Sequence, residues 1–248
     1  MKWIIITVVI LLLIVVLYRY LRKVYTENSN VFILTDIYSN RVSTYPDTDI
    51  KKPKDNINFS INLGLFIDNY YENHGYWRHI FHKGTPIDKI EYQYIDEYDD
   101  GWGELVADYP IQCPGLWLHP NKNTLRFVIQ TQYQDKKTNI TEHAFDKLYS
   151  SSSYNWYGSI NKELKEQIEY FDIENIPIRK VANFTFVIRQ GQLVVYLDGN
   201  LHSFFTLEGV PKINMNSLYI HGQRSYTGHM THLKIYPIPI TDKKALSL

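Results

Sequence analysis

The feature that most constrains the fold is a strict alternation of apolar and polar residues over positions 57–67. Apolar residues occupy every second position of this segment: Ile57, Phe59, Ile61, Leu63, Leu65 and Ile67. Polar or small residues stand between them, with Phe66 as the one exception. Successive side chains of a strand point to opposite faces, so a period of two predicts a long strand with one buried face.

Further short strand patterns, separated by turn residues, follow along the chain. They lie at 31–37, 76–83, 125–131, 184–188, 193–197, 201–207, 217–221 and 230–236. Gln190-Gly191 and Asp198-Gly199 are typical of the tight turns that join two strands of a hairpin. Many short strands with few helical patterns predict an all-β sandwich or barrel.

The N-terminus carries an apolar run at 3–18, centred near Leu12, with one threonine and no charge. Trp3 and Tyr18 bound the run as an aromatic belt would, and the basic residues Arg19, Arg22 and Lys23 follow. A membrane helix needs about 20 mostly apolar residues, with roughly 17 as the lower end. No small-residue cleavage site follows. The sequence therefore predicts a membrane anchor over 1–23, a tether with a first strand over 24–56, and one globular domain over 57–248.

Charge and cysteine content narrow the possible partners and the compartment. Lysine plus arginine and aspartate plus glutamate both number 26, so no basic surface for nucleic acid is indicated. Cys113 is the single cysteine, which rules out an intrachain disulfide and favours a reducing compartment. The excess of basic residues after the apolar run also favours a domain on the cytoplasmic side.

Several segments resemble the concanavalin A-like lectin/glucanase superfamily, specifically the laminin-G-like jelly rolls found in eukaryotic and large-DNA-virus proteins. They are FSINLGLFI (59–67), IFHKG (80–84), PGLWLHP (114–120), NTLRFVI (123–129), NIPI (175–178), LVVYLDGNL (193–201), LYI (218–220) and the stretch 228–236. The resemblance implies an antiparallel jelly-roll β-sandwich. It implies no particular activity, because this fold hosts lectins, glycosidases and structural domains.

The stretch 133–175 is longer than the strand connection expected at that place, so we interpret it as an insertion. It holds the one helical pattern of the chain: Ile160, Leu164, Ile168 and Phe171. Trp156 and Tyr157 lie inside it and are candidates for an exposed contact surface. Trp102 and Trp117 are further candidate sugar platforms, although the motif around Trp117 favours core packing.

Carboxylates could serve either hydrolysis or calcium binding. Glycosidases need two carboxyl groups about 5 to 9 Å apart, and the related glucanases carry them as Glu-x-Asp-x-x-Glu on one strand. The acidic cluster between 91 and 100 does not have this spacing, so we expect no enzyme. Asp96, Asp99 and Asp100 remain candidate calcium ligands, since the resemblance implies calcium sites in such loops. A solvated loop is the favoured alternative.

The nine histidines suggest no metal site. His79 and His82, like His229 and His232, are three apart in predicted strands, so the two members of each pair are expected on opposite faces. No spacing of cysteine and histidine resembles a zinc site. Cys113 precedes a proline and is interpreted as a buried, inert thiol.

These observations favour a non-catalytic, membrane-anchored structural or interaction protein. The resemblance to virus-encoded jelly rolls suggests a minor capsid or virion membrane protein, with the lipid bilayer and capsid proteins as partners. The domain would then lie on the cytoplasmic, capsid-facing side of the virion inner membrane. The alternative is a membrane-anchored lectin that binds glycans, and a glycosidase is the third hypothesis.

Overall fold

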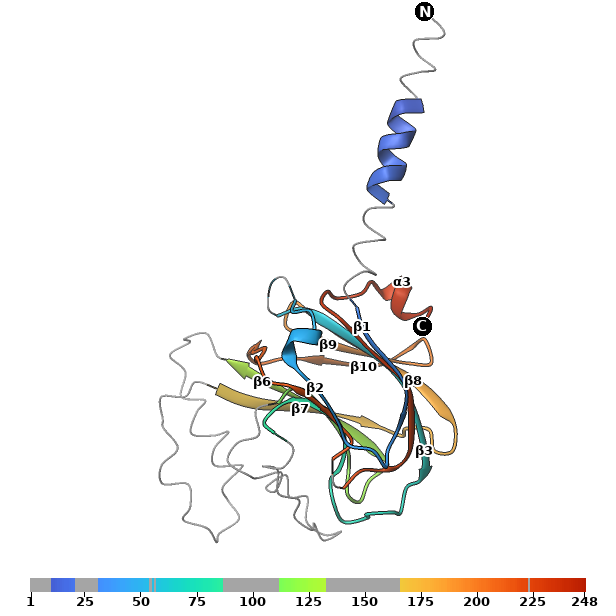
Figure 1. Cartoon of the computed structure of the whole chain (residues 1–248), viewed down its shortest axis with the longest axis vertical. Helices are drawn as coiled ribbons and strands as arrows, with labels where there is room; N and C mark the ends of the chain where they lie inside the picture. Colours follow the sequence, from blue (N-terminus) through green and yellow to red (C-terminus); the bar gives the residue numbers. More distant parts are fainter. Residues whose placement is uncertain are drawn as a thin grey trace, which may run out of the picture.

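In the computed structural model, two antiparallel sheets stack face to face as a β-sandwich (Figure 1). The structure describes residues 10–20, 31–53, 55, 57–86, 112–132, 166–222 and 224–248. One sheet, here called sheet A, has the strand order β1-β13-β3-β8-β9-β10. The other, sheet B, has the order β11-β6-β5-β4-β12-β2, and β7 pairs with β6. The all-β sandwich expected from the sequence is confirmed.

The elements have the following bounds: β1 Phe32–Tyr38, β2 Ser43–Tyr45, the 3-10 turn η1 Asp47–Asp49, β3 Phe59–Asn69, β4 Arg78–Gly84, β5 Gln112–Leu118, β6 Thr124–Gln132, β7 Glu166–Glu174, β8 Val181–Arg189, β9 Gln192–Leu197, β10 Asn200–Thr206, β11 Val210–Pro211, β12 Leu218–Ile220, β13 Thr227–Tyr236 and the helix α3 Asp242–Ala245.

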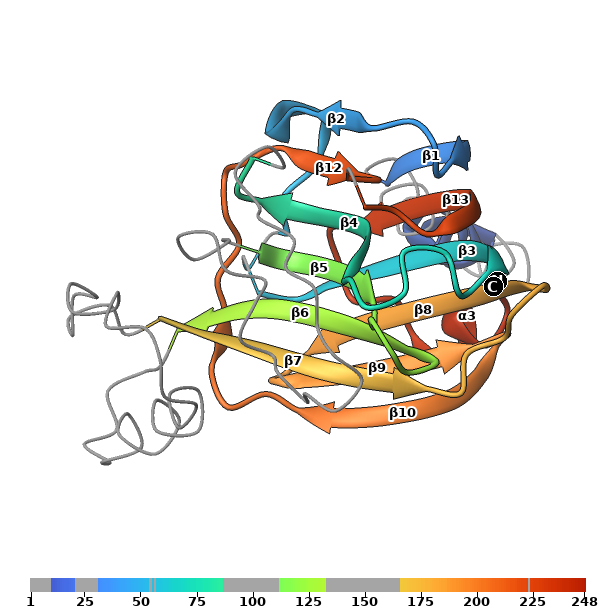
Figure 2. The same cartoon turned by 90° about the horizontal axis from the view of Figure 1, so that it is seen from below.

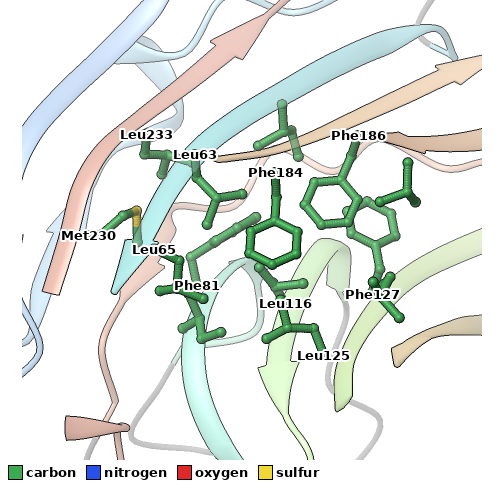
Figure 3. Close-up of a cluster of buried hydrophobic side chains, with 14 of the residues drawn as sticks. Leu63, Leu65, Phe81, Leu116, Leu125, Phe127, Phe184, Phe186, Met230 and Leu233 are labelled. Carbon is green, nitrogen blue, oxygen red and sulfur yellow. The ribbon is translucent and has the colours of Figure 1, made fainter. Parts of the chain in front are cut away.

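Strand β3 lies inside sheet A, between β13 and β8, and the alternation in its sequence places one set of side chains in the core. Leu63 and Leu65 on β3 meet Phe184 and Phe186 of β8 in the layer between the sheets (Figure 3). Sheet B contributes residues such as Phe127, whose ring stacks on Phe186 with a centroid distance of 4.8 Å. Burial of these aliphatic and aromatic side chains is the main driving force for the sandwich.

The helical interpretation of 160–171 is wrong from residue 166 onward. Residues 166–174 form strand β7, which pairs with β6 over nine residue pairs from Thr124↔Glu174 to Gln132↔Glu166 (Figure 2). Ile173 and Phe171 turn to the core, whereas Tyr170 is exposed, so the true period over this stretch is two. The edge of β6 offers a continuous row of backbone donors and acceptors, and pairing with them outweighs a local helical pattern.

The N-terminal apolar run contains a helix over residues 10–20, whose large apolar side chains are 46–64% exposed. Among the residues that the structure describes, no helix is long and apolar enough to cross a membrane. Leu12, Tyr18 and Arg19 lie in this helix, while Trp3, Arg22 and Lys23 lie outside the described residues.

Candidate functional site

An open hollow of about 340 Å³ lies on the outer face of sheet A, at the end of β3. Three segments form it: the end of β1 with the turn after it, the end of β3, and the start of β13. The residues that line it are Tyr38, Ser39, Asn40, Phe66, Asp68, Thr227, Gly228 and His229. They come from opposite ends of the sequence, and the antiparallel pairing of β1, β13 and β3 brings them together.

Aromatic rings form one wall of the hollow. The ring of His229 lies 5.1 Å from the ring of Phe66 and 5.9 Å from the ring of Tyr38, as centroid distances. Tyr38 is 63% exposed, whereas Phe66 and His229 are half-buried. The wall is therefore anchored in the sheet through two rings and presents the third to solvent.

Polar side chains form the rim beside these rings. Asp68 at the end of β3 and Asn40 in the turn after β1 are both exposed. A carboxylate accepts hydrogen bonds, and an amide both accepts and donates them. The hollow thus places an acceptor and a mixed donor–acceptor next to an exposed aromatic ring.

The floor of the hollow depends on Gly228. Its φ of +154° lies in a region that residues with a side chain rarely adopt, and a Cβ there would overlap the carbonyl oxygen of Phe66. The hydroxyl of Ser39 donates to the Gly228 carbonyl across 2.8 Å and accepts from the Gly228 amide across 3.1 Å. These two bonds join the turn after β1 to the start of β13.

Tyr38 is positioned from behind by His221. The Nδ1–H of His221 donates to the backbone carbonyl of Tyr38 across 2.9 Å, and its Nε2 accepts from the Tyr226 hydroxyl across 3.2 Å. Burial lowers the pKa of His221 to about 4 and raises the pKa of Tyr226. Both groups are therefore neutral near pH 7, and the arrangement behind Tyr38 is uncharged.

A loop between β3 and β4 contacts Thr227, one of the residues that line the hollow, and is held by Arg78. The buried guanidinium donates to the carbonyls of Tyr70 and His119, and lies 4.5 Å from the centroid of the Tyr70 ring. In the same loop the Glu72 carboxylate accepts from the hydroxyl of Thr227. Arg78 thereby orders a loop that is joined to the hollow through Thr227.

None of the residues that line this hollow was predicted from the sequence as a site residue. Trp156, Tyr157 and Trp102, and the candidate calcium ligands Asp96, Asp99 and Asp100, lie outside the described residues. Trp117 is fully buried, as expected for a packing residue, and its Nε1 donates to Gln112 across 2.7 Å. Cys113 is buried as well, and burial raises the pKa of its thiol to about 12, which agrees with an inert group.

The prediction that His79 and His82 point to opposite faces is wrong. The pairing of β4 with β5 shifts register between His79 and Phe81, and this bulge turns both rings to the same side. The Nε2 of His79 lies 2.8 Å from the Nδ1 of His82. Within the described part of the chain, no three His, Cys, Asp or Glu residues are grouped to hold a metal ion.

Sequence reasoning missed the hollow, although one signal pointed to it. Phe66 is the only apolar residue on the polar side of the alternating segment, and the structure places it on the outer face as part of the aromatic wall. An apolar ring on a solvent-facing position of a strand marks a candidate contact surface. Tyr38 and Asp68 carry no comparable sequence signal.

No family model and no curated protein matches the chain. Among solved structures, a carbohydrate-binding domain of the Ruminococcus gnavus IT-sialidase, bound to α2,3-sialyllactose, is similar with 9% identity and a TM-score of 0.48. This match covers 87% of this chain and 96% of that one.

Two further similar structures are much longer than the part matched. The binding domain of botulinum neurotoxin DC, in complex with rat synaptotagmin II, matches at 13% identity and a TM-score of 0.41 over 77% of this chain and 35% of that one. A Trypanosoma rangeli sialidase matches at 13% identity and a TM-score of 0.41, over 78% of this chain and 23% of that one. At these values no ligand or activity is transferred, and the resemblance to the concanavalin A-like superfamily stays a prediction.

Proposed function

We propose that this protein is a non-catalytic glycan-binding protein and that the hollow at the end of β3 is its binding site. The observation that carries the proposal is the exposed ring of Tyr38 beside the exposed carboxylate of Asp68 in one hollow. The apolar face of a sugar ring stacks on an aromatic ring, while its hydroxyls donate to a carboxylate.

The dimensions of the hollow agree with a small ligand. Binding pockets for small molecules have volumes of about 300–1,000 Å³, and they combine an apolar lining with a few placed polar groups. The volume of about 340 Å³ falls at the lower end of this range. It suits one sugar unit at the end of a glycan, with the remainder of the chain in solvent.

A glycan array with the full chain in detergent micelles tests this function. Binding to a defined set of glycans is expected, and Tyr38→Ala should weaken the interaction roughly tenfold, which corresponds to ~1.4 kcal/mol. Asp68→Asn should weaken it as well, because a carboxylate accepts hydroxyl hydrogen bonds more strongly than an amide.

Phe204→Ala is the matched control, since Phe204 is a 54% exposed ring on β10 of the same sheet, outside the hollow. The control variant should bind glycans as the unmodified protein does. An array without any bound glycan, or equal binding by the Tyr38 and Phe204 variants, would refute a glycan site in the hollow.

A second candidate function is membrane anchoring of a structural or interaction domain, and the exposed apolar side chains of the helix at 10–20 favour it. In its specific form the protein is a minor capsid or virion membrane protein whose domain contacts capsid proteins. Flotation of the full chain with liposomes tests anchoring, and protease protection of intact membranes tests the side on which the domain lies. A protein that stays at the bottom of the gradient would contradict this function.

A further inference from the structure

Helix α3 covers a second apolar cluster on the outer face of sheet A. Ala245 packs there with Val187, Val194 and Tyr236 of the sheet and with Ile240 of the segment after β13. The segment is fixed by a hydrogen bond from the Ile240 amide to the Ser60 hydroxyl, 2.9 Å long. This part of the outer face therefore lies at the beginning of β3, whereas the hollow lies at its end.

Apolar side chains beside α3 remain exposed. Leu201 and Phe204 on the edge strand β10 are 62% and 54% exposed. Their pairing partners on β9, Tyr196 and Val194, belong to the cluster that α3 covers. Leu246, directly after α3, is 54% exposed, and its carbonyl lies against Gly199 at the turn before β10. We call these three side chains, together with Lys243 and Lys244 on α3, the α3 patch.

The charges of the α3 patch suit an interfacial position. Lys243 is exposed, and the ammonium group of Lys244 lies 4.9 Å from the centroid of the Tyr236 ring. The one acidic residue of the helix, Asp242, is already paired with Arg189 across 2.8 Å and accepts from the Tyr196 hydroxyl across 2.7 Å. Apolar side chains flanked by lysines are typical of surfaces that lie on anionic headgroups.

The N-terminal part of the chain enters the sandwich at the same cluster. Val31 packs against the side chains that α3 covers, and β1 begins directly after it. Residues 21–30 separate Val31 from the helix at 10–20, and ten residues span at most about 35 Å even when fully extended. A membrane that holds this helix therefore holds the α3 patch within reach of its surface.

We propose that the α3 patch docks on the lipid headgroups of the membrane that holds the helix at 10–20, and that the glycan hollow at the other end of β3 stays uncovered. This inference rests on the membrane-anchoring function proposed above. Phe66 in the hollow lies six positions along β3 from Ser60 beside α3, or about 20 Å at roughly 3.3 Å per step. The hollow would thus remain accessible while the patch is covered.

Site-specific fluorescence quenching tests the docking on the full chain in nanodiscs of phosphatidylcholine and phosphatidylserine with brominated acyl chains. The native Cys113 is buried, so a cysteine introduced by Phe204→Cys or Leu246→Cys takes up a thiol-reactive fluorophore selectively. We expect quenching at both positions at least twofold stronger than at Tyr71→Cys, a 77% exposed position beyond the end of β3. Adding Lys243→Glu and Lys244→Glu to the variant labelled at 204 or 246 should bring its quenching closer to that at position 71.

A label at Val16→Cys, in the helix at 10–20, separates the two proposals. Quenching at position 16 without excess quenching at 204 and 246 would overturn docking and leave membrane anchoring intact. Absence of quenching at all positions would overturn both. Equal quenching at 71, 204 and 246 would also overturn the docking, because the protein would then have no preferred face toward the lipid.

Discussion

The Nε2 of His79 donates a hydrogen bond of 2.8 Å to the Nδ1 of His82 inside sheet B. The direction follows from the neighbours, because the His79 Nδ1 already accepts from the Gly222 amide across 2.8 Å. The Nε2 of His82 in turn donates to the carbonyl of Thr85 across 2.7 Å. Both rings are fully buried and are neutral in this arrangement, and the Trp117 ring lies 4.5 Å from the ring of His79.

Acid should destabilise the protein through these buried histidines. Burial lowers the pKa of His82, His119 and His221 to about 4 and that of His79 well below its ordinary value. The unfolded chain binds protons on these residues near pH 6.5, whereas the folded chain does not. Stability is therefore complete above about pH 6.5 and falls as the pH drops toward 4, by up to ~1.4 kcal/mol per pH unit for each histidine.

Urea unfolding at a series of pH values measures this effect. His82→Gln should reduce the slope between pH 6.5 and 4, while His202→Gln, at an exposed position, should leave it unchanged. A free energy of unfolding that is flat over this interval would contradict the neutral arrangement of the buried rings.

Gly228→Ala should destabilise the fold and disrupt the hollow, because the new Cβ would overlap the Phe66 carbonyl. We expect the free energy of unfolding, measured with urea, to fall by at least ~2 kcal/mol, since β3 or the start of β13 must shift. Gly191→Ala is the control: its φ is +73°, and a Cβ there meets nothing within 4 Å. It should cost only about 1 kcal/mol. An equal decrease in the free energy of unfolding for both variants would show that the close contact of Gly228 with β3 does not contribute to stability.

Arg78→Met should cost about 3 kcal/mol, because it leaves buried carbonyl groups without their donor. The loop between β3 and β4 should then exchange its backbone amide hydrogens faster, as measured by hydrogen–deuterium exchange with mass spectrometry. Arg179→Met, at an exposed arginine, is the comparison and should change the free energy of unfolding by less than ~0.5 kcal/mol. Unchanged exchange over 70–76 in the Arg78 variant would argue against its role in ordering this loop.

The strand assignment of β7 predicts an energetic coupling between Arg126 on β6 and Asp172 on β7. Two bonds of 2.7 Å join the guanidinium to the carboxylate, and the guanidinium carbon lies 4.3 Å from the centroid of the Tyr170 ring. A double-mutant cycle with Arg126→Ala and Asp172→Ala should give a coupling of ~1 kcal/mol.

The exposed pair Lys180–Asp198, at 3.1 Å, serves as the reference for this cycle and should give a coupling near zero. A coupling near zero for Arg126 and Asp172 as well would contradict the register of β7 against β6.

The alternating strands were predictable from the sequence because one face of each meets the core and the other meets a more polar layer. Strand β5 lacked this signal: all seven of its residues are buried, so its sequence shows no alternation. Strand β7 was missed for a different reason. Its local pattern favours a helix, and only the open edge of β6, reached through tertiary pairing, decides for a strand.

The sequence by itself determined the all-β character of the domain and the apolar character of the N-terminal helix. These properties follow from hydrophobic periodicity and composition, which act locally along the chain. Only the tertiary structure decided that Tyr38, Phe66 and His229 form one wall and that a bulge unites His79 with His82. Such arrangements depend on strand register across distant segments, and a shift by one residue would turn each side chain to the other face.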